Sequence, residues 1–440
     1  MDSTATSAHA GMARARRFRS RIEATGFDDA RGSRGHVSLP VVARIVAFGL
    51  PITVPGLFTL TAGPLLAALL WPILTSRSRP GPRLLTPVGL AVYGCVASGG
   101  VLALLSGAPA AFRRVDQWNA LGQAIVLVSF GLIVIAAFWC VEATGVRWTL
   151  AMFALGFAVN VGRVRVGQVE NLWKYGLGLA VVVIVLVGIP RARIGLQVIA
   201  CLVLAAFSAL NDTRNITGVL VLAAAATAVS PFMQNRRASA MKFIVSVVGF
   251  ASVAYGAFTA ISWAIARGWF GEAIATRQEI QQRAFGALGG RTEYGAFFSM
   301  FLHKPMGYGL GVFPSMNDIE VGKEGLDRYA RGAGGAYVDD YLFGGNIELH
   351  SIAADLWVQC GLVGLAVAVV AGLVIVAAMA DFSASSVDVG PAVLVYVAGQ
   401  ALWDLAFSPL IANYSSFALA VAIALFLRRG RALAGPSPVT

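Results

Sequence analysis

Long apolar runs separated by short polar segments are the feature that most restricts the fold of this 440-residue chain. Apolar residues make up 57% of it and charged residues 13%, whereas soluble domains contain about 25% charged residues. Inside a bilayer every backbone polar group must be bonded internally, so such runs predict helices. The composition therefore predicts an all-α polytopic membrane protein embedded in a lipid bilayer.

At about 20 apolar residues per crossing, the chain holds about twelve candidate transmembrane helices. They cover residues 40–56, 58–75, 84–106, 119–142, 146–162, 175–190, 194–211, 214–231, 241–266, 350–379, 388–407 and 409–427. The predicted organisation is a disordered basic tail (1–38), nine helices (39–267), a long polar loop (268–349), three helices (350–428) and a second tail (429–440).

The charge distribution predicts the orientation of these helices. The net charge of +12 comes mostly from basic residues beside the apolar runs, so membrane topology explains it and no nucleic-acid partner is expected. Placing the more basic connections inside puts both tails in the cytoplasm. The loop 268–349 then lies outside a cytoplasmic (inner) membrane.

The four cysteines lie in apolar runs, with neither metal-ligand spacing nor a pairing pattern, so we expect small buried apolar residues. They are Cys95, Cys140, Cys201 and Cys360. The sequence predicts no metal site and no cofactor site.

Three basic residues at predicted external positions need a separate explanation. Arg214 opens a helix in the context N-D-T-R-N-I-T-G. Either it extends toward water and pairs with Asp212, or it faces the bundle interior and binds an anion. Arg165 and Lys174 lie in an external connection, either as interfacial anchors or as part of a phosphate site.

The long loop is predicted to contain two helices. Residues 272–288 have the pattern of an amphipathic helix at the interface. A second helix, over 292–302, carries Tyr294 and stops at Pro305. The three glycines of 307–311 predict a flexible turn, and residues 314–347 predict a solvated loop. Its paired carboxylates, Asp339 and Asp340, are either solvated or a catalytic pair.

His350 stands where the polar loop meets the next apolar helix. The positive potential of a helix N-terminus favours neutral imidazole, which can act as a base near neutral pH. The alternative is an interfacial histidine without a role. His303, beside Lys304, is interpreted as a loop residue.

The order of these features resembles the O-antigen ligase and O-antigen polymerase family of bacterial envelope glycosyltransferases. The resemblance rests on Arg214, on Arg291 followed by an aromatic and H-x-P-x-G-x-G-x-G (303–311), and on His350 before a helix containing G-L-x-G (361–364). Two departures are N-D-T-R, where the family usually has S-R-G, and Ser351, where it commonly has Asn.

The resemblance implies a GT-C-like fold and metal-independent, inverting transfer of a glycan from a polyprenyl-diphosphate donor to a lipid or glycan acceptor. Arg214 and Arg291 would then neutralise the leaving diphosphate, because guanidinium binds phosphate oxygens in pairs and stays charged. His350 would accept the proton of the acceptor hydroxyl. Around them, Arg165, Lys174 and Tyr294 would form the rim of the diphosphate site.

Other function classes predict different features. A transporter or flippase of lipid-linked glycans needs charges along a path across the membrane. The main intramembrane candidates, Asp355 and Asp404, are both expected near the outer face. A cell-wall polymerase of the shape, elongation and division type also uses an external loop, but its motifs are not apparent. Ligase and polymerase differ only in acceptor, and the sequence does not separate them.

Overall fold

The computed structural model describes residues 39–54, 60–70, 72, 81–107, 113–165, 171–233, 263–269, 293–329, 337–379 and 387–434, with isolated residues between 248 and 279. Regular secondary structure in these ranges is helical, and the only strand-like pairings there are isolated bridges at Thr53–Thr61 and Val115–Val312. The predicted all-α class is confirmed for this part of the chain.

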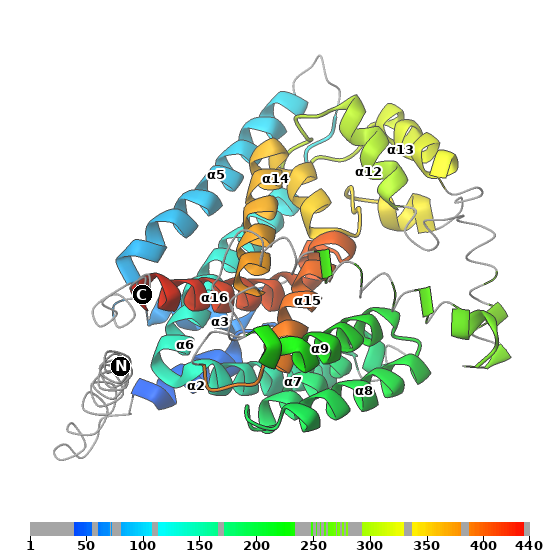
Figure 1. The fold of residues 1–440 in the computed structure, drawn as a ribbon. Helices are drawn as coiled ribbons and strands as arrows, with labels where there is room; N and C mark the ends of the chain where they lie inside the picture. The colour runs from blue at the N-terminus through cyan, green and yellow to red at the C-terminus, as the bar shows by residue number, and fades with distance from the viewer. Residues whose placement is uncertain are drawn as a thin grey trace, which may run out of the picture. The chain divides into compact units, whose positions relative to one another are not determined.

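The helices follow the order of Figure 1, and their bounds are as follows. They are α2 (Leu39–Gly49), α3 (Ala62–Leu69), α5 (Gly81–Gly107), α6 (Gln117–Arg165), η2 (Trp173–Leu177), α7 (Gly178–Gly188), α8 (Ile194–Leu210), α9 (Arg214–Met233), α12 (Glu293–His303), α13 (Met316–Tyr329), η4 (Tyr337–Leu342), α14 (Ile352–Met379), α15 (Pro391–Phe407) and α16 (Leu410–Ala434).

Four of the described helical segments are long and apolar enough to cross a bilayer: Thr86–Gly107, Gln117–Val164, Ile352–Met379 and Leu410–Arg429. Four shorter apolar helices accompany them: α2, α7, α8 and α15. The four buried cysteines match their predicted environment. These observations support a membrane-embedded helical protein, while the number of twelve crossings stays a prediction.

Helix α6 contains two of the predicted crossings. At Gly145 the backbone leaves helical geometry (φ 83°, ψ 165°), so the helical run divides into two helices at this residue. The predicted boundary between 119–142 and 146–162 lies at this glycine. Glycine adopts positive φ without the steric cost of a Cβ, which explains why the division occurs here.

Helix α14 differs from the single straight crossing predicted for 350–379. Gly361 has φ 65° and ψ −148°, and the position of a Cβ on Gly364 would overlap the carbonyl oxygen of Leu356. Residues eight apart in a straight helix lie about 12 Å apart, so the chain bends sharply between them. A short segment, 352–360, therefore precedes the longer apolar helix that begins after Gly361.

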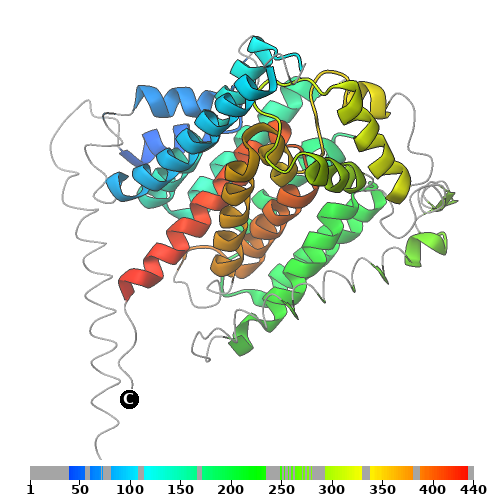
Figure 2. The ribbon, with the colours of Figure 1, turned by 90° about the horizontal axis from the view of Figure 1, so that it is seen from above.

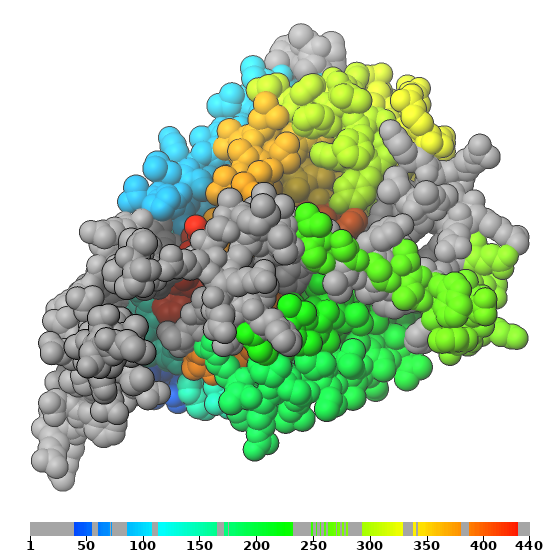
Figure 3. Space-filling model, viewed as in Figure 1, coloured from blue at the N-terminus to red at the C-terminus, as the bar shows by residue number. Residues whose placement is uncertain are grey.

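The C-terminal helices α14, α15 and α16 lie at the centre of the described bundle (Figures 1 and 2). Helix α9 packs on α8 and α15, α16 packs on α6, and α14 packs on α5. Helices α12 and α13 pack on each other, and atoms of α12 lie directly against those of α14 (Figure 3). Small residues permit close packing here, because a Cβ on Gly399 would lie 2.9 Å from Cγ1 of Val219.

The segment after α12 is fixed by contacts, and the predicted flexible turn is wrong. Gly307, Gly309 and Gly311 have φ values of 84°, 112° and 67°, and a Cβ on any of them would overlap neighbouring backbone. The amides of Tyr308 and Gly309 donate to the Val358 carbonyl at 2.9 Å. Glycine is needed at these positions for positive φ and for close approach to α14 (Gly307), α5 (Gly309) and the start of α6 (Gly311).

Several predicted segments have other outcomes. The helix predicted over 292–302 is confirmed as α12, whereas the solvated loop predicted over 314–347 contains α13 and η4. In the predicted crossing 58–75 the described helix, α3, has eight residues, about 12 Å of helix. Most of 241–266 and of the amphipathic segment 272–288 lies outside the described residues.

Candidate functional site

Two short turns mark one end of the helical bundle, which we call the site end. One turn, Asn211–Thr213, joins α8 to α9, and the other, Ser408–Pro409, joins α15 to α16. The Ala392 amide at the start of α15 donates to Oε1 of Gln197 at the start of α8 (3.2 Å). Helices α8 and α15 therefore start at the same end, and the short first turn makes α9 antiparallel to both.

The same packing sets the heights of the two turns along the bundle. Gly399 of α15 faces Val219 of α9. Arg214 lies five residues from Val219, about 7.5 Å of helix, and Phe407 lies eight residues from Gly399, about 12 Å. Arg214 and the last turn of α15 therefore lie within about one helical turn of the same height.

A cluster of opposite charges surrounds the α8–α9 turn. Asp212 accepts a hydrogen bond from Nζ of Lys174 at 3.2 Å, and its other carboxylate oxygen lies 3.8 Å from Nε of Arg214. The second distance makes an ion pair but is too long for a hydrogen bond between these two atoms. The predicted pairing of Arg214 with Asp212 is confirmed, and binding of an external anion stays a prediction.

Polar side chains hold this charge cluster in position. The Asn171 amide donates to the Asn211 carbonyl at 2.7 Å, and the Asn171 side-chain oxygen accepts from the Lys174 amide at 2.9 Å. The Trp173 indole donates to Oγ of Ser208 at 3.1 Å. The π-helical turn η2 is thereby tied to the α8–α9 turn, which sets the position of Lys174.

His350 lies just before α14 in a left-handed backbone conformation, with φ 49°. Its neighbours on both sides are anchored. The Leu349 amide donates to Asp355 at 3.2 Å, and the Ser351 hydroxyl donates to the Leu405 carbonyl at 3.0 Å. The second oxygen of Asp355 accepts from the Leu410 amide at 2.8 Å. His350 is therefore attached to the α15–α16 turn at the site end.

Tyr294 reaches the same turn from α12. Its hydroxyl donates to the Ala406 carbonyl at 2.6 Å, and its ring packs edge-on against Phe407 with centroids 5.6 Å apart. Ser351 and Tyr294 thus bind the consecutive carbonyls of Leu405 and Ala406. The structure brings the segments of His350 and Tyr294 together, although 56 positions separate them in the chain.

The remaining predicted site residues have different outcomes. Arg291 lies outside the described residues, two positions before the first residue of α12. Arg165 ends α6, and its side chain is also outside the described part. His303 contacts the Asn317 side chain through Nε2 at 3.2 Å and is exposed, in agreement with its interpretation as a loop residue. Asp339 pairs with Lys323 at 2.5 Å.

Asp355 and Asp404, the two carboxylates expected inside the membrane, both lie at the site end. Asp355 binds the first amide of α16, and Asp404 accepts from the Ser408 hydroxyl at 2.8 Å and from the Gln400 amide at 3.0 Å. Each carboxylate is almost fully buried and bonded. They therefore stabilise the α15–α16 turn, next to the carbonyls that bind Ser351 and Tyr294.

A buried ion pair in the loop region was missed from the sequence. Arg113 donates to both oxygens of Asp318 at 2.7 Å, and the Ser315 hydroxyl and amide also donate to this carboxylate. Burial alone would raise the pKa of Asp318, but the hydrogen bonds from Arg113 and Ser315 outweigh it and hold the pKa below its usual value. The pair joins the segment before α6 to α13.

Replacing Asp318 with alanine is expected to expose α13 to local unfolding. Breaking a buried pair by removing one partner costs about 3–5 kcal/mol, or about two to four orders of magnitude in the opening equilibrium. Hydrogen exchange of the α13 amides measures this change, and the Arg113→Met, Asp318→Leu double variant should recover most of the protection. Equal exchange rates of the α13 amides in the wild type and in Asp318→Ala would contradict this role of the ion pair.

The pH dependence of this ion pair has a definite sign. Because the pKa of Asp318 is lowered on folding, its stabilisation is present above the ordinary aspartate pKa of about 4 and is lost as the pH falls through the folded value. Protection of α13 in the wild type should therefore fall only below about pH 4.

Within the described residues, no group of three or more His, Cys, Asp or Glu side chains gathers at metal-binding distance. Three carboxylates at the site end, Asp212, Asp355 and Asp404, are bonded within the protein. Beside them lie cationic, imidazole and phenol groups, which are suited to binding anions and moving a proton. No protein-family model, curated protein or solved structure matches this chain. The geometry of the site end is therefore the basis for inferring function.

Proposed function

We propose that this chain is a membrane glycosyltransferase of the O-antigen ligase or polymerase type. It would transfer a glycan from a polyprenyl-diphosphate donor to an acceptor hydroxyl of a lipid or glycan at the outer face of the cytoplasmic membrane. In this proposal both termini are cytoplasmic, and the site end and the loop 268–349 face outward. The transfer is inverting and uses no metal.

The observation that carries the proposal is the placement of two strained residues. Among the described residues, the non-glycine positions with positive φ are Asp212 (51°) and His350 (49°). One pairs with Arg214 and the other is the predicted base, and both lie at the site end. Such conformations cost about 1–3 kcal/mol each and cluster at functional sites, where surrounding contacts hold them.

The chemistry assigns a role to each residue. The acceptor oxygen forms a bond to the anomeric carbon while the bond from that carbon to the phosphate oxygen breaks. The polyprenyl diphosphate leaves with the electron pair, and the acceptor proton passes to the imidazole of His350. Arg214 and Arg291 stabilise the negative charge that develops on the diphosphate, with Lys174, Arg165 and Tyr294 around them.

The transporter and flippase alternative is less well supported. Such a protein requires ionisable groups at successive depths along a path. Asp355 and Asp404 instead both stabilise the α15–α16 turn, where their oxygens accept hydrogen bonds from the Leu410 amide and the Ser408 hydroxyl. This arrangement favours chemistry at one end of the bundle over movement across it.

Purified protein incubated with a polyprenyl-diphosphate oligosaccharide tests the proposal. We expect release of polyprenyl diphosphate together with a longer glycan, which indicates a polymerase, or with glycan on a second lipid, which indicates a ligase. Movement of intact donor across a vesicle membrane without bond cleavage would instead establish a flippase. If donors of several glycan types are neither cleaved nor moved across the membrane, the proposal is wrong.

A further inference from the structure

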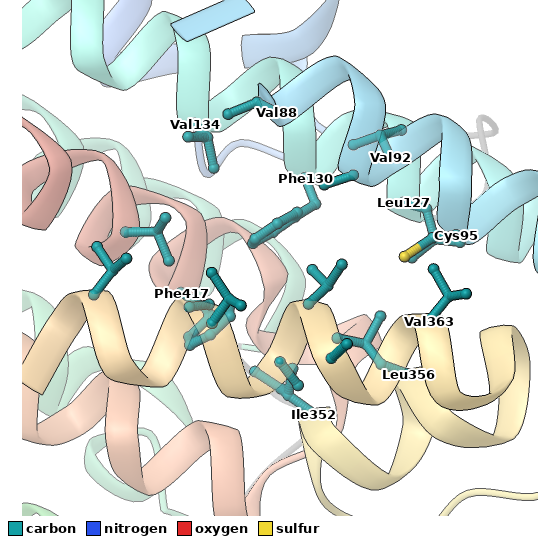
Figure 4. Close-up of a pocket in the computed structure, with 18 of the residues that line it drawn as sticks. Val88, Val92, Cys95, Leu127, Phe130, Val134, Ile352, Leu356, Val363 and Phe417 are labelled. Carbon is teal, nitrogen blue, oxygen red and sulfur yellow. The ribbon is translucent and has the colours of Figure 1, made fainter. Parts of the chain in front are cut away.

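An apolar groove of about 610 Å³ runs between α5, α6, α14 and α16. Its walls carry aliphatic and aromatic side chains, including Val92 and Cys95 of α5, Val363 of α14 and Phe417 of α16 (Figure 4). Phe130 of α6 also lines the groove and stacks on Phe417 with ring centroids 5.8 Å apart. Its volume falls in the range of about 300–1,000 Å³ that is typical of sites for small-molecule ligands.

The groove lies within helices that are long and apolar enough to cross a bilayer, and it is open on one side. Its lining on α14 includes Leu362 and Val370, which are 45% and 58% exposed. These residues stand on the apolar surface of a candidate crossing, so hydrocarbon chains of the bilayer can reach the groove sideways.

One end of the groove adjoins the site end. Ile352, which lines it, is the second residue after His350, and Leu356 follows Asp355 directly. The Leu410 side chain also lines the groove, while the Leu410 amide is bonded to Asp355. The first turns of α14 and the start of α16, which hold the segment of His350 in place, therefore also contribute to the wall of the groove.

We propose that this groove binds the isoprenoid chain of a polyprenyl diphosphate. This assignment rests on the proposed function, because it identifies the site of the donor's lipid chain. Apolar walls favour a hydrocarbon chain, which fills the space by close packing and brings no polar group that needs a partner. A chain lying here with its polar end toward Ile352 and Leu410 would present its diphosphate beside His350.

The continuity with His350 favours an isoprenoid over a phospholipid acyl chain. The α8–α9 turn, at the same end of the bundle, carries Lys174 and Arg214, and two cationic side chains suit a diphosphate. A glycerophospholipid would need partners for its ester groups where the groove offers apolar side chains.

Photolabelling of the full-length protein in phosphatidylglycerol nanodiscs tests the inference without requiring transfer. The probe is a glycan-free isoprenoid diphosphate with a diazirine in its chain, compared with a phosphatidylglycerol carrying a diazirine in its acyl chain. The key variants are adjacent valines of α14 with similar exposure. Val370, 58% exposed, lines the groove, whereas Val369, 52% exposed, does not.

We expect the isoprenoid probe to label peptides of α5, α14 and α16. Val370→Trp should lower this labelling about tenfold because the indole occupies the groove, and Val369→Trp should leave it unchanged. If Val370→Trp is not monodisperse, Ala91→Trp in the groove and Ala97→Trp on the exposed face of α5 give the same comparison.

Three outcomes would overturn the inference: labelling elsewhere, equal labelling of the groove by the acyl probe, or isoprenoid labelling unaffected by both groove variants. The proposed function fails separately. Groove labelling that depends on Val370 in a protein without transfer or cleavage activity would keep the lipid site and reject the transferase.

Discussion

Replacing His350 with alanine is expected to lower glycan transfer by about 10²–10⁴-fold, the usual contribution of a general base. The acceptor hydroxyl would then lose the group that takes its proton as the new bond forms. The measurement is single-turnover transfer by purified protein from a polyprenyl-diphosphate oligosaccharide. His303→Ala is the matched control, because this second loop histidine contacts Asn317 at an exposed position, and its loss should leave the rate unchanged.

The backbone at His350 permits a sharper version of this experiment. Asparagine adopts the left-handed conformation more readily than alanine, so His350→Asn preserves the φ of 49° while removing the imidazole. If the imidazole accepts the proton, the asparagine and alanine variants should be equally impaired. Near-normal transfer by a well-folded His350→Asn protein would show that the backbone matters at this position and the base does not.

Replacing Arg214 with alanine is expected to lower the rate of the chemical step by about 10²–10³-fold, the effect of removing one donor that stabilises a developing anion. The loss should appear mainly in kcat, because the negative charge on the diphosphate grows as the glycosidic bond breaks. Arg214→Lys should restore only part of the rate, since an ammonium group cannot bind two phosphate oxygens in the planar geometry of guanidinium.

Arg163 provides the control for Arg214. It lies near the end of α6 and donates to the carbonyl oxygen of Thr53, so Arg163→Ala removes an arginine that the proposal does not place in the diphosphate site. Transfer should then stay near the wild-type rate. Equal losses in Arg163→Ala and Arg214→Ala, or a change confined to KM in Arg214→Ala, would contradict a role for Arg214 in stabilising the leaving group.

The helical class and most described helix positions could be predicted because a bilayer imposes length and polarity on each segment. The division of α6 at Gly145 followed from a short polar interruption between two apolar runs. The bend of α14 did not, because the run is apolar on both sides of Gly361. Its cause is a long-range contact, since the segment 306–311 packs against Gly361 and Val358.

The site was predictable only where its contacts are local in the sequence. The pairing of Asp212 with Arg214 joins residues two positions apart and was proposed from the sequence. The bond from Tyr294 to Ala406 and the pair of Arg113 with Asp318 join residues 112 and 205 positions apart. Local patterns carry no information on such partners. The bond from Ser351, next to His350, to the Leu405 carbonyl likewise joins residues 54 positions apart.

An experimental map of the protein with bound polyprenyl diphosphate tests the central claim most directly. We predict that both phosphates lie at the site end, within hydrogen-bonding distance (about 2.7–3.2 Å) of the Arg214 and Arg291 guanidinium groups. The His350 imidazole should face the terminal phosphate across the space for the transferred sugar, where the acceptor hydroxyl approaches. Phosphates bound away from the α8–α9 and α15–α16 turns, or Arg291 far from both Arg214 and His350, would contradict the proposed transferase.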